Sequence, residues 1–543
     1  MWAPCFASSS GPGNDAKVSP HYSAHTTVDR SVSTSRVPQG EDHVWSGGAL
    51  SDLPHPTDED NVNAYLEEKN YPRPSATPSM PPLAMKSAKL TIHILPDDVL
   101  LGIFDLCRGS NEYCTQRVWR PLVHVCRRWR HIIFESPRHL HLLLVCDIRM
   151  PVKISLDTWP SLPIAILYSP HDKEGAENVI AAFERHSRVS WIVFNKLTSP
   201  ALEQFVHVMQ KPLLTLTGLH LQSFDEMAPV VPDAFLGGSA PELRSIFLEG
   251  VAFPALPRLA ASAMHLTKLR LQRIPDTGYI EPDVMATCLT TLPNLEELHI
   301  GFQSPRSPPL GIRPPLPTRT DLLALTYFVF RGDSTYLEDL IAQIRVPNLD
   351  SLNVWFFMDF IFVIPMLHNV ISSAERLKQP KRAHLELYPW TVRIALGLPT
   401  SLEMGTRCDR LEERVSWMVR LCKALSLHLS HVECLEITGD ADSQVELQDS
   451  MASMRWLDLF RSFTTVRGLY VSNELGPHVA HALQDLKGRR ATEVLPSLRK
   501  LSLGGLKPYG SVEKAIEPFV AARRLSDHPV VVEPWEQDLL RTW

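Results

Sequence analysis

Two different spacings of apolar residues divide the chain into regions with different predicted structure. From residue 95 to 140 apolar positions recur every three or four residues, as on one side of an α-helix. From about residue 216 onward they recur in short runs of the form L-x-x-L-x-L, which is typical of a strand in a repeated unit. Before about residue 85 Ser, Pro, Thr, Gly and His predominate and aliphatic residues are sparse. The sequence therefore predicts a disordered tail, a small helical module and a repeated region.

The helical module contains two amphipathic segments. The first follows Leu95-Pro96, with Asp97 and Asp98 in its first turn, where a helix N-terminus favours negative charge. The second begins near Pro121 and places apolar residues opposite a basic side. The apolar positions are Val99, Leu100, Ile103, Phe104 and Leu106 in the first segment, and Leu122, Val125, Cys126, Trp129, Ile132 and Ile133 in the second. So short a module buries little of its own surface, and we expect a partner to cover part of it.

The order of these residues resembles the F-box. The family pattern has a Leu-Pro step, an acidic residue two positions later, an Ile-Phe pair and a Val-Cys-Arg-Arg-Trp-Arg run, which correspond here to Leu95-Pro96, Asp98, Ile103-Phe104 and Val125 to Arg130. Asp98 stands where the family usually has Glu, and the polar segment 107–119 is longer than usual. The resemblance implies that residues 89–145 dock the Skp adaptor, and through it a cullin-RING ubiquitin ligase. It assigns adaptor binding to Leu95, Pro96, Asp98, Leu100, Ile103, Phe104, Val125, Cys126 and Trp129.

An alternative interpretation of the same pattern is an ordinary helical hairpin. In that case Phe104 and Trp129 only fill the core of the hairpin, and no adaptor is implied. The periodicity alone is compatible with both interpretations.

The predicted strands of the repeated region follow one another at roughly similar intervals. Most neighbours are roughly 23 to 32 residues apart, which overlaps the leucine-rich-repeat period. Several begin with a Pro-x-Leu step, as at Pro241, Pro293, Pro347 and Pro496. The predicted strands are Leu216 to Leu221, Leu243 to Leu248, Leu266 to Leu271, Leu295 to Ile300, Leu325 to Phe330, Leu349 to Val354, Leu435 to Ile437, Val466 to Val471 and Leu498 to Leu503.

Segments with helical spacing lie between these strands, most clearly from Leu411 to Leu425. The interval from about Leu387 to Leu435 is too long for one repeat, so we expect an inserted helix there. The Pro-rich stretch 304–317 is interpreted as an extended loop that leaves the repeats, and the alternative is a docking site for a proline-binding partner domain. The whole chain resembles a fungal-type F-box protein of the α/β class, with a disordered tail (1–88), an F-box (89–145) and a leucine-rich-repeat-like solenoid (146–543).

The strands of such a solenoid present a candidate binding surface. Residues between and after the leucines face away from the core, and aromatic and Arg side chains are frequent anchors of protein interfaces. The alternative is a solvated face on which a few aromatic rings pack against each other. The residues predicted to bind a protein substrate are His220, Phe247, Arg270, His299, Trp355 and Tyr470; Gln222, Asn353 and Glu436 share their face.

Composition narrows the classes of function. A net charge of -6 over 543 residues disfavours a nucleic-acid binder. The nine cysteines include no CxxC pair, which indicates reduced thiols in the cytoplasm or nucleus. No segment is predicted to span a membrane, no phosphate-binding loop or metal-ligand pattern occurs, and Arg331-Gly332-Asp333 is interpreted as a chance tripeptide. We therefore expect no membrane partner, no cofactor, no metal and no catalytic residue.

The first functional hypothesis is a substrate receptor of a Skp-cullin-F-box ubiquitin ligase. The F-box would dock the adaptor, while the repeats would hold an unidentified protein substrate. The second hypothesis is a non-catalytic repeat scaffold that binds the adaptor without ligase activity. An enzyme built on a repeat frame is the least favoured class, because no constellation of reactive groups is present.

Overall fold

The computed structural model describes residues 92–106, 121–135, 141–146, 151–159, 161–169, 175–305, 319–357, 364–397, 401–408, 410–440 and 450–535. The predicted tail (1–88), the polar segment 107–119 and most of the Pro-rich stretch lie outside the described residues. The chain divides into two units, Met1–Ala88 and Lys89–Trp543, and all described residues belong to the second. Within them the fold is mixed α/β, with many helices and one large, mostly parallel sheet.

The described chain begins with a helical hairpin, which we define as residues 92–106 and 121–135. It comprises the 3-10 helix η1 (Ile92–Ile94), α1 (Asp97–Leu106), a helical turn at 121–125 and α3 (Arg127–Glu135). The amide of Leu100 donates to the carbonyl of Pro96, so α1 begins directly after this proline. Asp97 and Asp98 lie in its first turn, as the charge pattern predicts.

Sixteen strands form one sheet in the described part of the chain. The strands are β1 (Leu142–Val145), β2 (Ile164–Tyr168), β3 (Val189–Phe194), β4 (Gly218–Gln222), β5 (Ser245–Glu249), β6 (Lys268–Ile274), β7 (Glu297–Phe302), β9 (Tyr327–Gly332), β11 (Ser351–Phe356), β12 (Arg382–Tyr388), β13 (Thr391–Leu396), β14 (Leu402–Thr406), β15 (Cys434–Gly439), β16 (Gly468–Val471), β17 (Lys500–Leu503) and β18 (Val531–Pro534). Two short strands, β8 (Thr320–Asp321) and β10 (Ile344–Arg345), pair separately.

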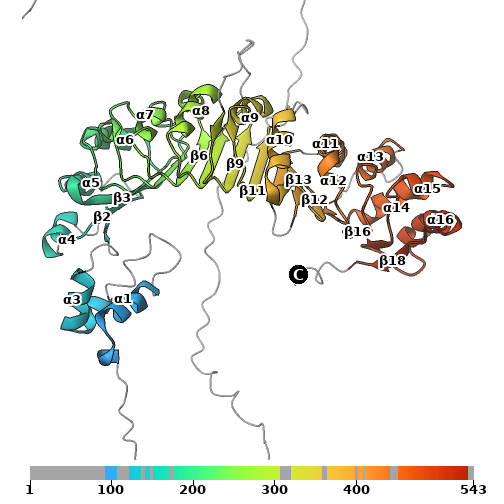
Figure 1. Cartoon of the computed structure of the whole chain (residues 1–543), viewed down its shortest axis with the longest axis horizontal. Helices are drawn as coiled ribbons and strands as arrows, with labels where there is room; N and C mark the ends of the chain where they lie inside the picture. The colour runs from blue at the N-terminus through green and yellow to red at the C-terminus, as the bar shows by residue number, and fades with distance from the viewer. Residues whose placement is uncertain are drawn as a thin grey trace, which may run out of the picture. The chain divides into compact units, whose positions relative to one another are not determined.

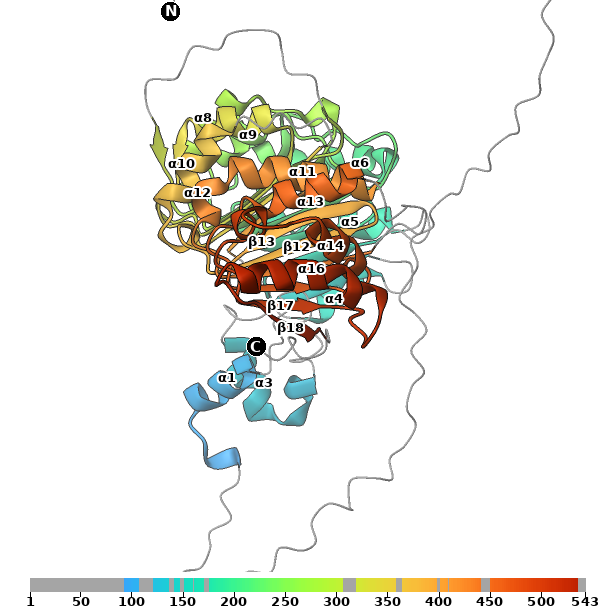
Figure 2. The ribbon, with the colours of Figure 1, turned by 90° about the vertical axis from the view of Figure 1, so that its right-hand side faces the viewer.

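The connections between strands contain the helices. They are α4 (Val152–Thr158), α5 (Ala176–Phe183), α6 (Ser199–Val206), α7 (Leu256–Ala260), α8 (Pro282–Thr290), α9 (Ser334–Ile341), α10 (Pro365–Ser373), α11 (Leu411–Ala424), α12 (Ser426–Leu429), α13 (Ser450–Phe460), α14 (Gly476–Gln484), α15 (Arg490–Glu493) and α16 (Ser511–Leu525). The 3-10 helices are η4 (His186–Arg188), η5 (Val208–Gln210), η6 (Phe235–Gly238), η7 (Asp276–Gly278) and η8 (Glu375–Leu377). Figures 1 and 2 show helices such as α8, α9 and α13 on the same side of the sheet.

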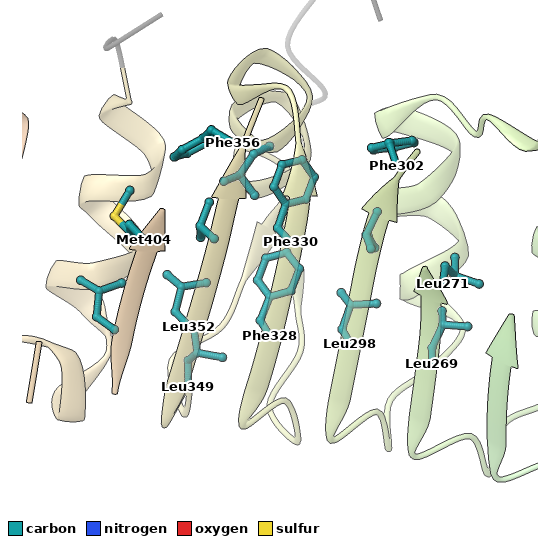
Figure 3. Close-up of a cluster of buried hydrophobic side chains, with 14 of the residues drawn as sticks. Leu269, Leu271, Leu298, Phe302, Phe328, Phe330, Leu349, Leu352, Phe356 and Met404 are labelled. Atoms are coloured by element: carbon teal, nitrogen blue, oxygen red, sulfur yellow. The ribbon is translucent and has the colours of Figure 1, made fainter. Parts of the chain in front are cut away.

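The strand sequences explain why these helices lie on one face of the sheet. In β6, β7, β9 and β11 buried and half-buried residues alternate, because successive side chains of a strand point to opposite faces. Buried residues such as Leu269, Leu298 and Phe328 then form ladders across neighbouring strands (Figure 3). Each such side chain contributes roughly 1.5–3 kcal/mol by its removal from water. We call the opposite, half-buried side the open face.

All nine predicted strands correspond to strands of this sheet, each beginning within about two residues of its predicted start. The sheet also extends beyond them. It begins at Leu142, within the segment predicted as 89–145, and includes β1, β2 and β3, which the L-x-L pattern does not predict. These three strands are nearly continuous apolar runs, and of the three only β2 follows a Pro-x-Leu step, Pro160-Ser161-Leu162.

The long interval between Leu387 and Leu435 contains more than the inserted helix. The helix is present as α11, but β12, β13 and β14 precede it as an antiparallel meander. Because the chain reverses twice, β14 pairs with β11, and β12 pairs with β15. The insertion therefore adds two strands without interrupting the sheet.

Candidate functional site

The hairpin places its nine predicted adaptor-binding residues in different environments. Leu100, Phe104 and Trp129 are buried in its interior, with exposed fractions of 0%, 8% and 8%. The half-buried residues are Leu95, Ile103 and Cys126, and the exposed ones are Pro96, Asp98 and Val125. The structure thus separates residues that hold the hairpin together from residues that a partner can reach.

The hairpin interior centres on one aromatic pair. The ring centroids of Phe104 and Trp129 lie 4.9 Å apart, and the two rings join α1 to α3. The indole Nε1 of Trp129 is buried and has no hydrogen-bond partner among the described residues. The sulfur of Cys126 accepts a hydrogen bond from the Trp129 amide, and so satisfies one of the open donors at the start of α3.

Arg128, which belongs to the Val125 to Arg130 run and to the basic side of the second segment, connects the two helices of the hairpin. Its guanidinium donates to the carbonyl oxygen of Leu95 at 2.6 Å and to Oδ1 of Asp97 at 2.9 Å. These bonds tie α3 to the turn that contains Leu95 and Pro96. The only sequence signal for this role was the position of Arg128 next to Trp129 in the Val125 to Arg130 run.

One side of α1 remains apolar and uncovered by the described residues. Val99 and Leu106 have exposed fractions of 42% and 86%, and Ile103 is half-buried. Their spacing places them on one side of the helix, next to the buried side of Leu100 and Phe104. Gly102 lies on the same side, and a Cβ there would meet no atom within 4 Å. We call these four residues the α1 stripe: Val99, Gly102, Ile103 and Leu106.

The open face of the sheet brings together most of the predicted substrate-binding residues. In the parallel register His220 pairs with Phe247, Phe247 with Arg270, and Arg270 with His299. Trp355 and Tyr470 lie on the same face but farther along the sheet, and all six side chains are half-buried. The predicted phase of the strands is therefore confirmed.

Part of this face is satisfied by its own contacts. The rings of His220 and Phe247 pack at 4.2 Å, and Arg270 donates two hydrogen bonds to Glu297, at 2.6 and 2.8 Å. His299 also contacts Glu297, with Nε2 at 2.6 Å from Oε1. Burial alone would raise the pKa of Glu297, but the hydrogen bonds from His299 and Arg270 lower it to about 2. Around β4 to β7, the aromatic and charged side chains thus pack against each other.

A cavity of about 610 Å³ opens farther along the same face. Of the six residues predicted to bind a protein substrate, Trp355 lines this cavity. We call this cavity the arginine pocket; it is lined by Gln303, Pro305, Arg331, Trp355, Phe356, Phe357, Thr391 and Arg407. Its residues come from the ends of β7, β9, β11 and β14 and from the start of β13. Because these segments are far apart in sequence, no local motif could predict the pocket.

The comparisons with known proteins leave the family open. No known protein family matches the sequence, and no curated protein is significantly similar to it. No helix in the described part of the chain is both long and apolar enough to cross a membrane. Among the same residues, no group of three or more His, Cys, Asp or Glu side chains is arranged to hold a metal ion.

Proposed function

We propose that this chain is the substrate-recognition subunit of a Skp-cullin-F-box ubiquitin ligase. In this proposal the hairpin is an F-box that binds the Skp adaptor, and the sheet belongs to a leucine-rich-repeat-like solenoid that binds a protein substrate. The chain would then accelerate ubiquitin transfer by proximity, with the chemistry performed by the other subunits of the ligase.

The observation that carries the proposal is the α1 stripe beside a well-packed hairpin interior. An exposed apolar patch next to polar residues is a frequent mark of a protein interface. Gly102 strengthens this argument, because Gly in an exposed helix interior is roughly 0.5–1 kcal/mol less favourable than Ala. No described part of the chain occupies the space beside Gly102, so nothing among the described residues requires its small size. It would allow a partner helix to approach α1 closely.

The exposed residues of the F-box resemblance support the same interface. Pro96 and Val125 are accessible, and Val125 has an exposed fraction of 55%. Arg128 fixes the Leu95-Pro96 turn through its bond to the Leu95 carbonyl. The accessible residues are therefore held on a defined framework, which lowers the entropy lost on binding.

The test is a titration of purified Skp adaptor against the full chain and two variants. Gly102→Gln places a good helix former in open space, so the hairpin should fold while the partner is blocked. Ile154→Gln is the matched control, because Ile154 is an apolar residue on α4 with an exposed fraction of 56%. We expect Gly102→Gln to weaken adaptor binding more than tenfold, a loss of about 1.4 kcal/mol, and Ile154→Gln to have no effect.

Equal affinities for the wild type and Gly102→Gln would refute the adaptor interface. A pull-down then separates the two functions that share this interface. Cullin in the adaptor complex supports the ligase subunit, whereas adaptor without cullin supports the non-catalytic scaffold.

A further inference from the structure

We propose that the arginine pocket binds a phosphate group on a protein, and, on the basis of the proposed function, that the protein substrate is recognised in its phosphorylated form. The inference depends on the guanidinium groups of Arg331 and Arg407, which line the pocket, on the like charge of Arg273 near Arg331, and on the aromatic wall of the pocket.

The sheet register places the pocket residues beside one another. Arg331 of β9 is the direct neighbour of Trp355 on β11, and Trp355 is the neighbour of Gly405 on β14. A Cβ at Gly405 would lie 2.9 Å from a ring carbon of Trp355, so the indole lies across the glycine and has a fixed position. Arg407 follows directly after the end of β14 and lines the same cavity. The pocket thus has one rigid aromatic wall and two guanidinium groups.

Three positive charges influence one another at this site. The pKa of Arg331 is lowered first by burial, and then by the like charges of Arg407 and Arg273. No carboxylate of the described residues forms an ion pair with any of the three. Arg273 lies 5.2 Å from the centre of the Phe224 ring, a contact that leaves its positive charge unneutralised.

Other arginines on the open face are neutralised by carboxylates. Arg270 pairs with Glu297, and Arg393 pairs with both Glu386 and Glu403. The last two acids lie near the pocket along the sheet, but both are engaged by Arg393. Among the described residues, Arg331 and Arg407 at the pocket and Arg273 near Arg331 have no carboxylate partner, and their like charges repel. A bound anion would remove this repulsion.

The chemistry favours a phosphate monoester over a carboxylate. A phosphorylated side chain has a charge of roughly -1.5 to -2 at neutral pH and three acceptor oxygens. Guanidinium groups bind such oxygens through paired, charge-assisted hydrogen bonds. A single carboxylate would leave most of the positive charge unneutralised. The cavity, at about 610 Å³, is within the size range of ligand pockets and has room for residues on either side of the phosphate.

The test measures binding of a peptide library with a central phosphothreonine to the full chain by fluorescence anisotropy. The same library with Thr, and with Glu, at that position supplies the two comparisons. We expect the phosphorylated library to bind at least tenfold more tightly than either. An Arg331→Gln/Arg407→Gln variant should lose this preference, and Arg461→Gln, which removes an exposed charge directly after the end of α13, should retain it.

Thermal unfolding distinguishes a variant that has lost the binding site from a variant that has lost the fold. Because the two arginines repel each other, the double variant should be at least as stable as the wild type, and inorganic phosphate should raise the Tm of the wild type only. Equal binding of the three libraries would refute the proposal. Tighter binding of a single-stranded oligonucleotide than of the phosphopeptides would also overturn it, in favour of a nucleic-acid site.

Adaptor binding, measured on the same preparations, keeps the two proposals separate. If the adaptor binds and the phosphopeptides do not, the phosphate site is wrong and the proposed function stands. If the phosphopeptides bind and the adaptor does not, the phosphate site stands and the ligase function is wrong.

Discussion

Replacement of Trp129 tests whether this residue stabilises the hairpin or contacts the adaptor directly. Trp129 is nearly fully buried, and its ring packs against Phe104. Replacing a buried aromatic residue by Ala typically costs roughly 3–5 kcal/mol. So short a hairpin is expected to have little more stability than this, so Trp129→Ala should unfold it locally while the sheet remains folded.

Trp129→Phe is the informative companion variant. Phe keeps a ring against Phe104 and removes an indole N–H that is buried without a described partner. Leaving such a donor unpaired costs roughly 1–3 kcal/mol, and its removal offsets much of the volume lost. We therefore expect Trp129→Phe to stay within about 1 kcal/mol of the wild type.

Hydrogen exchange of the full chain, followed by mass spectrometry, measures the hairpin and the sheet separately. In Trp129→Ala the amides of α1 and α3 should exchange at least roughly a hundredfold faster, since about 1.4 kcal/mol corresponds to a factor of ten. Amides of β5, β6 and β7 should not change. Unchanged protection of α1 in Trp129→Ala would refute the structural role. A loss of adaptor binding by Trp129→Phe, with the hairpin still protected, would show instead that the partner contacts the indole itself.

Two further predictions concern the open face. The pKa of Glu297 is held at about 2, below its ordinary value of 4.5, so this carboxylate stabilises the fold above about pH 4.5, and the contribution is lost as the pH falls toward 2. Urea unfolding should show wild type more stable than Glu297→Gln at pH 6, with a difference that shrinks at pH 3; a difference independent of pH would contradict this assignment. Gly405→Ala should displace the Trp355 indole, change the near-UV circular dichroism and weaken phosphopeptide binding, whereas Gly301→Ala, whose Cβ would have its nearest contact at 3.5 Å, should do neither.

The strands from β4 to β11 could be predicted because the positions of their leucines in the sequence are the buried positions of the strands. Leu269 and Leu271 are two residues apart in β6, so both side chains point to the face of the sheet that the helices cover. Leu298 lies on the same face in β7, and the same spacing recurs in each repeat. In β1 and β2 burial also alternates, but the residues between the buried ones are apolar too, so the sequence does not show the alternation. In β3 both Ile192 and Val193 are buried, so the alternation disappears although the strand remains.

The antiparallel meander could not be predicted for a different reason. The turn between β12 and β13 contains Pro389 and Trp390, with Trp390 at a φ of +67°. Pro389 is a common first central residue of a turn, but the positive φ that follows it is usually adopted by Gly or Asn, so Trp390 at that position does not indicate a hairpin. The arginine pocket was missed as a consequence. Arg407 approaches Arg331 only because the meander places β14 next to β11.

The two halves of the open face suggest different roles. Around β4 to β7 His220 packs on Phe247, and Glu297 neutralises Arg270 and binds His299, which is the pattern of a surface satisfied by its own contacts. Near β9 to β14 the half-buried Arg331 and the exposed Arg407 have no ion-pair partner among the described acids, and a bound anion would reduce the repulsion between them. Of the six predicted substrate-binding residues, Trp355 is the one placed in this second region. If the chain is a substrate receptor, we therefore expect its affinity to depend chiefly on residues around Trp355, with the His220–Phe247 pair contributing mainly to the stability of the sheet.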